Sequence, residues 1–173
     1  MSYWEAGGKS DQWYTPPYIF DALDCMFDMD VAAPMCIPSY IGERLRPTDP
    51  KGSRRWLWQN SLETDWSGFV WMNPPFGGRN SLKAWLDKFF AHGDGIALTP
   101  DRTSAPWFRS AWERADLVLF TPKVRFLRPD GTEGKSPSNG TALWAAGPRA
   151  VEALERAANR GLGILAKPLS LAA

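Results

Sequence analysis

The sequence predicts an α/β fold built as a three-layer sandwich, with helices on both faces of one sheet. Short apolar runs bounded by turn-forming residues alternate along the chain with longer stretches whose apolar residues recur at helical spacing. The residues with the most distinctive chemistry follow the short runs directly, which is where open α/β sheets bind their ligands. The final strands, with a hairpin segment between helices, predict an antiparallel edge on a mostly parallel sheet.

The first third of the chain predicts a flexible terminus, a helix, a strand and a loop. Residues 1–10 include a polar, glycine-containing stretch, which is typical of a frayed terminus. A threonine followed by a proline is a favourable start for a helix, which is expected over residues 16–26. A strand is expected over residues 27–32. It is followed by a long surface loop over residues 34–55, which contains several prolines and arginines.

The rest of the chain continues this alternation of strands and helices. A buried strand over residues 69–72 ends before two consecutive prolines, because proline cannot continue a ladder of backbone hydrogen bonds. The next helix is expected to begin at Asn80 and to end at Gly93, and a later one to begin at Thr103 or Ser104. The other expected elements are strands over 56–59, 96–99, 117–120, 141–144 and 163–166, a strand with a tight turn over 123–133, a flexible link over 134–140, and a helix over 148–159.

Length and composition limit the classes of function. The 173 residues fit a single domain over residues 1–173 without internal repeats, and a chain of this size buries about 70% of its unfolded surface. There is no long apolar span and no secretory leader, so we expect a soluble protein outside the membrane, in the cytoplasm of a bacterium or a phage-infected host cell. Two cysteines and one histidine exclude a disulfide framework and a zinc cluster, and we expect no metal. With a net charge of +1, binding to nucleic acid requires a local basic patch.

The sequence Asn-Pro-Pro-Phe at residues 73–76 directly follows one of the predicted strands. Each proline biases the residue before it towards an extended backbone, and Pro75 has no N–H to donate. The stiff bend leaves the Asn73 side-chain oxygen and the Pro74 carbonyl as acceptors, with the ring of Phe76 beside them. This set suits a flat aromatic amine, because the acceptors take its two hydrogens and restore the nitrogen lone pair, while the ring stacks on the base. On these four residues alone, a rigid turn with an aromatic plug is the simpler interpretation.

The order and spacing of several segments favour the functional interpretation. The chain resembles the phage-type DNA N6-adenine methyltransferase (Dam) family, whose members use S-adenosylmethionine. The resemblance covers nearly the whole chain and implies a Rossmann-like class I methyltransferase fold, S-adenosylmethionine as cofactor and double-stranded DNA as substrate. The segments that carry it are DQWYTP at 11–16, FDMDVAA at 27–33, WSGFVWMNPPFG at 66–77, TPDRTSAPWF at 99–108 and KVRF at 123–126.

The resemblance implies cofactor-binding residues in three further segments. A Thr-Pro pair preceded by two aromatic residues leads into the pocket, an acidic residue lies near the end of the first strand, and a polar residue after residue 59 meets the cofactor's adenine. The chain lacks the Gly-rich loop of the general methyltransferase pattern, and either Glu43 or Asp49 is a candidate for the cofactor ribose. A purely structural role stays open for each segment: a capped helix, a strand-end carboxylate or a turn. The expected cofactor-binding residues are Trp13, Tyr14, Thr15, Pro16, Asp30, Ala32, Ala33, Asn60 and Asn73.

Basic and aromatic residues interleave after residue 120, a pattern typical of an arm that contacts nucleic acid. We define residues 121–140 as the candidate arm; an exposed hairpin made soluble by its charges explains the pattern equally well. Asp101 and Arg102 either form an ion pair or contact the substrate. The expected DNA-binding residues are Arg79, Arg102, Lys123, Arg125, Phe126 and Arg128.

These features together predict a site-specific DNA methyltransferase that transfers a methyl group from S-adenosylmethionine to adenine N6. The target base must leave the duplex, at an unstacking cost of a few kcal/mol. Phe76 then receives its face, and Asn73 and Pro74 hold the amine in line with the methyl group, in a bend that Pro75 keeps stiff. Such alignment lowers a barrier by roughly 7–11 kcal/mol. Neither a strong base nor a covalent step is required. N4-cytosine methylation, protein glutamine N5 methylation and a non-catalytic nucleic-acid-binding module remain alternatives, and the oligomeric state and target sequence stay open.

Overall fold

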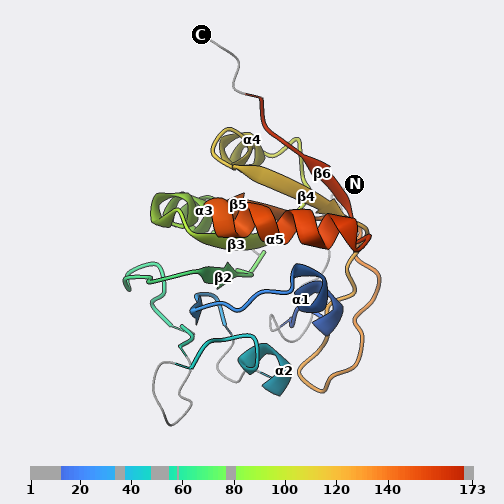
Figure 1. Cartoon of the computed structure of the whole chain (residues 1–173). Helices are drawn as coiled ribbons and strands as arrows, with labels where there is room; N and C mark the ends of the chain where they lie inside the picture. Colours follow the sequence, from blue (N-terminus) through green and yellow to red (C-terminus); the bar gives the residue numbers. More distant parts are fainter. Residues whose placement is uncertain (1–12, 34–37, 48–54, 58, 77–80, 170–173) are drawn as a thin grey trace.

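One mixed sheet forms the centre of the molecule (Figure 1). The computed structural model describes residues 13–33, 38–47, 55–57, 59–76 and 81–169. Its strands are β1 (Met29–Asp30), β2 (Val70–Met72), β3 (Gly95–Pro100), β4 (Leu117–Thr121), β5 (Thr141–Ala146) and β6 (Ile164–Ala166). Its helices are α1 (Pro17–Leu23), α2 (Ser39–Gly42), α3 (Ser81–His92), α4 (Pro106–Trp112) and α5 (Pro148–Asn159).

The sheet is parallel on one side and antiparallel on the other. In the order β1-β2-β3-β5-β4-β6, the first three strands are parallel neighbours. Strand β5 pairs antiparallel with both β3 and β4, and β6 pairs antiparallel with β4. The predicted α/β class and the parallel pairing of the first strands are therefore confirmed. The antiparallel part is larger than the expected edge, because β5 inserts between β3 and β4 and reverses the direction in the middle of the sheet.

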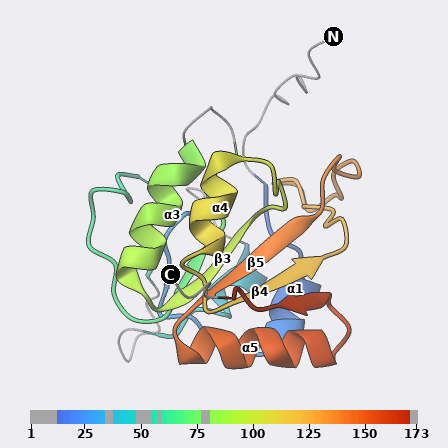
Figure 2. The ribbon, with the colours of Figure 1, turned by 90° about the horizontal axis from the view of Figure 1, so that it is seen from above.

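Helices cover both faces of this sheet (Figure 2). Helices α3 and α4 lie on one face, where Phe89 and Phe108 pack with Met72 and other strand residues in one buried cluster. Helices α1 and α5 lie on the other face, over a second cluster that includes Trp71. Successive side chains of a strand point to opposite faces, which is why neighbours such as Trp71 and Met72 belong to different clusters. The described residues thus form the three layers that the alternating pattern predicts.

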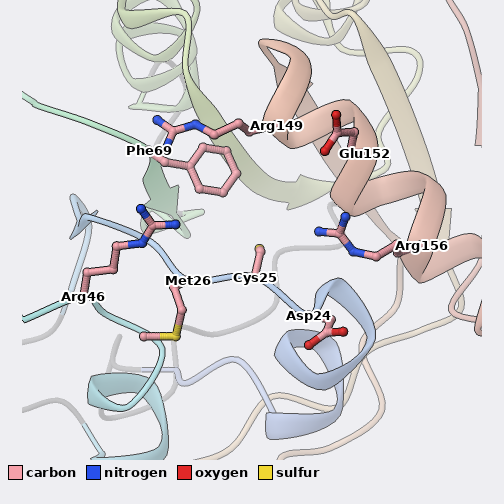
Figure 3. A pocket seen from close by; sticks show the side chains of 8 residues that line it. All are labelled: Asp24, Cys25, Met26, Arg46, Phe69, Arg149, Glu152 and Arg156. Carbon is pink, nitrogen blue, oxygen red and sulfur yellow. The ribbon is translucent and has the colours of Figure 1, made fainter.

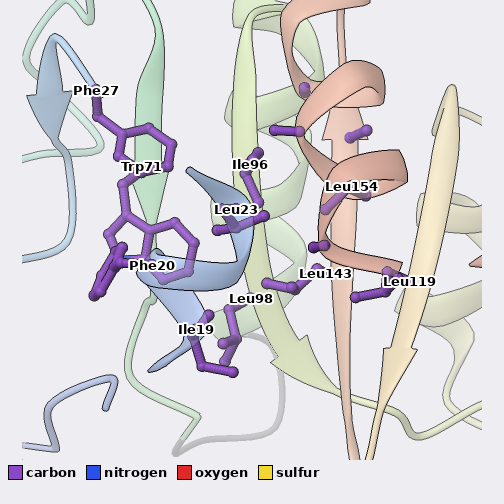
Figure 4. Packing of buried hydrophobic residues seen from close by; sticks show 14 of the residues in the cluster. Ile19, Phe20, Leu23, Phe27, Trp71, Ile96, Leu98, Leu119, Leu143 and Leu154 are labelled. Carbon is purple, nitrogen blue, oxygen red and sulfur yellow. The ribbon is translucent and has the colours of Figure 1, made fainter. Parts of the chain in front are cut away.

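Trp71 holds β2 against α1 and the segment before β1 (Figure 4). Its ring centroid lies 4.9 Å from that of Phe20 and 5.5 Å from that of Phe27, in the edge-to-face and tilted geometries that aromatic pairs prefer. The side chain is 2% exposed. Because Asn73 lies only two residues further along the chain, this aromatic contact also fixes the strand end that carries the Asn-Pro-Pro-Phe motif.

Trp71→Ala is expected to lower the free energy of unfolding by about 3–5 kcal/mol, because the rigid neighbours cannot fill the cavity that it leaves. Chemical denaturation followed by circular dichroism measures this change. Trp56→Ala is the matched control: this tryptophan is 37% exposed, and we expect a loss of about 1 kcal/mol or less. Equal losses in the two variants would contradict the structural role of Trp71.

Two helices differ from their predicted bounds for local backbone reasons. The helix expected over 16–26 ends at Leu23, because Asp24 adopts a left-handed conformation (φ 49°) and its N–H donates to the Phe20 carbonyl at 2.9 Å. Helix α4 begins at Pro106 with Ala105 before it, later than the expected start at Thr103 or Ser104, since proline suits the first position of a helix. Helix α3 ends before Gly93 as predicted; this glycine has φ 78° and donates its N–H to the Phe89 carbonyl.

The predicted loop and hairpin segments also differ. Within the loop expected over 34–55, the described residues contain α2, and Leu45 forms a parallel bridge to Phe27. Of the strand expected over 56–59, the described residues show a bridge between Trp56 and Asp30, and residue 58 lies outside them. In the candidate arm, Leu127 makes isolated bridges to Glu133 and, from the other side, to Tyr14, in place of a regular strand. Residues 1–10 and the expected helix start at Asn80 lie outside the described residues. Among the helices that are described, none is long and apolar enough to cross a membrane.

Candidate functional site

Four strands of the sheet end at one edge, which we call the carboxyl edge. Strands β1, β2 and β3 are parallel, and β4 runs in the same direction because β5 is antiparallel to both β3 and β4. Asp30 ends β1, Asn73 follows β2, Asp101 follows β3, and the candidate arm begins at Thr121, the last residue of β4. The sheet therefore brings together, at one edge, residues that are far apart in the sequence.

Asn73 is held by a side chain from the start of the described chain. Its Nδ2 donates a hydrogen bond to the Thr15 hydroxyl at 3.1 Å, and Asn73 is partly buried while Thr15 is buried. The Asn73 side-chain oxygen accepts no hydrogen bond from another described residue. Pro74 is buried and Pro75 is exposed, so the bend turns the chain from the interior to the surface between these two residues. The amide oxygen is thus the end of Asn73 that remains available to a ligand.

Phe76 lies at the surface next to the candidate arm. Its side chain is 37% exposed, and its ring contacts the ring of Phe126 edge-to-face at 6.0 Å. Phe126 is partly buried and packs against the core cluster on the α1–α5 face. This contact joins the Asn-Pro-Pro-Phe motif to the arm and leaves part of the Phe76 ring uncovered, as stacking on a flat ligand requires.

The segment over residues 13–16 connects the motif and the arm. Tyr14 exchanges two backbone hydrogen bonds with Leu127, both 2.9 Å long, and the next residue holds Asn73. Trp13 lies against the arm: the Arg128 guanidinium is 6.0 Å from its ring centroid, and a methyl group added at Gly134 would approach its ring to 2.6 Å. The described contacts of Trp13 are therefore with the arm. The sequence predicted instead that Trp13 binds the cofactor.

Asp30 is a buried carboxylate at the end of β1. It is 4% exposed, and its Oδ1 accepts one hydrogen bond from the Ala32 N–H at 3.1 Å. Burial raises the pKa of Asp30 to about 7, while the hydrogen bond from Ala32 lowers this pKa and offsets part of the effect. Ala32 is partly buried and Ala33 is buried. Acids with shifted pKa values are enriched at functional sites. The cofactor-binding role of Asp30 stays a prediction.

Asn60 lies in a turn that is attached to the end of β1. Asn60 has φ 51°, is exposed, and its carbonyl accepts hydrogen bonds from the N–H groups of Glu63 and Thr64. Ser61 makes this attachment: it is buried, and its hydroxyl donates a hydrogen bond to the Val31 carbonyl. The backbone of Asn60 therefore forms a turn, as the structural interpretation expects. The residue is exposed to solvent beside the end of β1.

Two residues that support this edge were not predicted from the sequence. Ser61 anchors the turn that carries Asn60, and Tyr40 donates its hydroxyl hydrogen bond to the Thr15 carbonyl at 3.1 Å. Neither residue lies in a recognisable motif. For Ser61, the sequence shows only that a serine follows Asn60. No local signal pointed to Tyr40, because its partner is 25 positions away.

The expected DNA-binding residues fall into distinct groups. Lys123 and Arg102 are exposed, and neither makes an ion pair with another described residue. Of the two roles left open for Asp101 and Arg102, the ion pair is therefore absent among the described residues, and contact with the substrate stays a prediction. Arg125 is exposed and lies 3.5 Å from Glu133. Arg128 has a structural role, since its guanidinium donates to the Thr132 hydroxyl at 3.0 Å and to the Glu133 carbonyl at 2.6 Å. Arg79 lies outside the described residues.

A pocket of about 330 Å³ lies near the opposite end of the parallel strands (Figure 3). Three arginines line it, and two of them lie beside acidic groups: Arg149 pairs with Asp94, and an Arg46 guanidinium nitrogen lies 3.7 Å from an Asp28 carboxylate oxygen. Burial raises the pKa of the Cys25 thiol in this pocket to about 11, so the thiol is neutral near pH 7. Its lining residues are Asp24, Cys25, Met26, Arg46, Phe69, Arg149, Glu152 and Arg156.

A second pocket, of about 320 Å³, lies beside the start of the candidate arm and is lined by Tyr18, Ala22, Thr121, Pro122, Arg160, Gly161 and Leu162. Neither pocket includes Asp30 or Asn73. We place the candidate site at the carboxyl edge because the reactive groups of the motif gather there. The described residues contain no group of three or more His, Cys, Asp or Glu side chains that is arranged to hold a metal ion.

Comparisons of the chain with models of protein families, with curated proteins and with solved structures find no match.

Proposed function

We propose that this protein is a DNA methyltransferase that transfers a methyl group from S-adenosylmethionine to adenine N6 of a flipped-out base. The observation that carries the proposal is the arrangement of Asn73 at the end of β2, with its Nδ2 bound to Thr15, its oxygen available, and the uncovered ring of Phe76 nearby. The parallel strands β1 to β3 with helices on both faces support a Rossmann-like methyltransferase fold.

The chemistry rests on the two acceptors of the bend. The exocyclic amine of adenine has a lone pair that is delocalised into the ring, and it is therefore a weak nucleophile. The Asn73 side-chain oxygen and the Pro74 carbonyl accept its two hydrogens and favour a more tetrahedral nitrogen with a localised lone pair. Phe76 supports the face of the base, and the nitrogen loses its extra proton to water after transfer. No side chain is required as a strong base.

S-adenosylmethionine, when bound, supplies an electrophilic methyl group. The donor and acceptor groups at the end of β1 fit this cofactor, because the Asp30 carboxylate has only one hydrogen bond in the described structure and retains capacity to accept from hydroxyl or ammonium groups. Asp30 pairs in register with Trp71, and Asn73 is two residues further along β2's direction. We therefore assign cofactor binding to Asp30 and base binding to Asn73. The two residues lie at the ends of neighbouring strands, and the axes of such strands are about 4.8 Å apart.

Exposed cations lie on the same side of the molecule as the motif. Lys123 and Arg125 belong to the arm whose Phe126 contacts Phe76, and Arg102 follows β3 at the same edge. Their charges suit contacts to DNA phosphates, which position a duplex without reading its sequence. Because the net charge of the chain is only +1, this local group carries the electrostatic part of the proposal.

The direct test incubates the protein with methyl-labelled S-adenosylmethionine and unmethylated duplex DNA, and then identifies the labelled base after hydrolysis. We expect N6-methyladenine. N4-methylcytosine would replace the adenine assignment by the nearest alternative, which uses the same amine chemistry. Label in protein glutamine would refute a DNA substrate. Absence of S-adenosylmethionine binding in calorimetry would favour the non-catalytic nucleic-acid-binding module.

Lys123→Ala is expected to weaken DNA binding uniformly across sequences and to lower the slope of log K against log salt concentration by about 1, because one phosphate contact is lost. Fluorescence anisotropy with a labelled duplex at several salt concentrations measures both effects. Arg46→Ala removes a cation near the opposite end of the strands and serves as the control, with an unchanged slope expected. An unchanged slope for Lys123→Ala as well would exclude Lys123 from the DNA contact.

A further inference from the structure

We infer that Thr15 is a positioning residue that holds the Asn73 side-chain amide in one orientation, with its oxygen end towards the substrate. This inference rests on the proposed function and assigns Thr15 a role other than contact with the cofactor. A primary amide has an accepting oxygen and a donating nitrogen of nearly equal size. Only the oxygen end accepts a hydrogen from the substrate amine; the nitrogen end would place donor against donor. Catalysis by Asn73 therefore requires an amide that is held in one orientation.

The Thr15 hydroxyl is the group that holds the amide. It accepts a hydrogen bond from Asn73 Nδ2 at 3.1 Å, which holds the nitrogen end towards the protein and leaves the oxygen end free. Thr15 is 1% exposed, and among the described residues the partner of its hydroxyl is Asn73. Burial of this extent favours a role exerted through Asn73.

The position of Thr15 is itself fixed on several sides. Tyr14, the preceding residue, is joined to Leu127 by two backbone hydrogen bonds of 2.9 Å, and the Tyr40 hydroxyl donates to the Thr15 carbonyl at 3.1 Å. Pro16 and Pro17 follow and restrict the backbone, and the β-branched threonine side chain has few rotamers. The acceptor is therefore held in place before any substrate arrives, as a supporting group of a catalytic residue must be.

Thr15→Val tests the inference, because valine keeps the shape of threonine and removes the hydroxyl. We expect the rate constant for methyl transfer at saturating substrates to fall about 10- to 100-fold, the range caused by a small misplacement of a catalytic group, with little change in KM for DNA. Thr15→Ser restores the hydroxyl and should recover the rate to within about threefold. A second readout is independent of activity: the side-chain amide resonances of Asn73, assigned with Asn73→Asp, should shift and exchange faster with solvent in Thr15→Val but not in Thr15→Ser.

Thr99→Val is the matched control for lost stability. Thr99 is a buried threonine at the end of β3 whose hydroxyl accepts a hydrogen bond from Trp144 Nε1 at 2.7 Å, and it has no contact with Asn73 among the described interactions. We expect this variant to unfold at a lower temperature while it keeps the wild-type transfer rate. An active wild-type protein with an equally active Thr15→Val variant would overturn the inference alone. A wild-type protein that transfers no methyl group would refute the proposed function.

Discussion

Asn73→Ala is expected to reduce methyl transfer to DNA by about 100- to 1,000-fold, the loss that follows removal of one preorganised polar group from a catalytic site. The amide oxygen accepts a hydrogen from the amine while the nitrogen becomes a nucleophile, so its loss raises the barrier of the transfer step. A time course of labelled methyl incorporation at saturating DNA and S-adenosylmethionine measures the effect.

The structure supplies the controls for this variant. Asn73 is only partly buried and follows the strand, so its truncation should change the free energy of unfolding by about 1 kcal/mol or less. Asn159→Ala removes an exposed asparagine at the end of α5 and should leave transfer unchanged. Retention of more than about a tenth of the wild-type rate by Asn73→Ala would contradict the amine-holding mechanism.

Asp30→Asn is expected to remove a pH-dependent loss of stability. The pKa of Asp30 is raised by burial to about 7 in the folded protein, from 3.8 for an ordinary aspartate. The folded state therefore binds the proton more tightly than the unfolded state, and wild-type stability falls as the pH rises from about 4 to about 7. Above pH 7 the full cost of the buried charge is present, up to about 4 kcal/mol at 1.36 kcal/mol per pH unit.

Urea denaturation of the wild type and Asp30→Asn at pH 4 and pH 8 measures this effect as a difference between the two proteins. Asparagine keeps an oxygen that accepts the Ala32 N–H and carries no charge. The variant should therefore gain stability relative to the wild type at pH 8, and the relative gain should disappear at pH 4. Titration of other carboxyl groups affects both proteins and largely cancels. A difference that is the same at both pH values would show that Asp30 keeps an ordinary pKa.

Sequence patterns predicted the elements whose signals are local and long. Helix α5 coincides with the predicted range, because a proline start and a complete apolar face define it within twelve residues. Strands β3 and β5 were located by continuous apolar runs, since both are buried on both faces. The strand predicted over 27–32 is shorter in the structure, and the strand predicted in the arm is replaced by isolated bridges. In both cases the extent of pairing depends on a partner elsewhere in the chain.

The order of the strands in the sheet could not be derived from the same patterns. Strand β5 follows β4 in the chain, yet it lies between β3 and β4 and pairs antiparallel with both. Periodicity along a strand specifies which faces are buried, and it contains no information about which neighbour is chosen. The larger antiparallel part of the sheet is a consequence of that choice.

The sequence by itself determined the stiff bend at residues 73–76, because two prolines restrict the backbone wherever they occur. It also determined that polar residues follow apolar strands. Only the tertiary structure decided that Thr15 holds Asn73 across 58 positions, that Phe76 meets Phe126, and that Asp30 is buried enough to change its pKa. The physical reason is that backbone restriction acts between adjacent residues, whereas hydrogen bonds, ring contacts and burial depend on which distant segments the fold brings together.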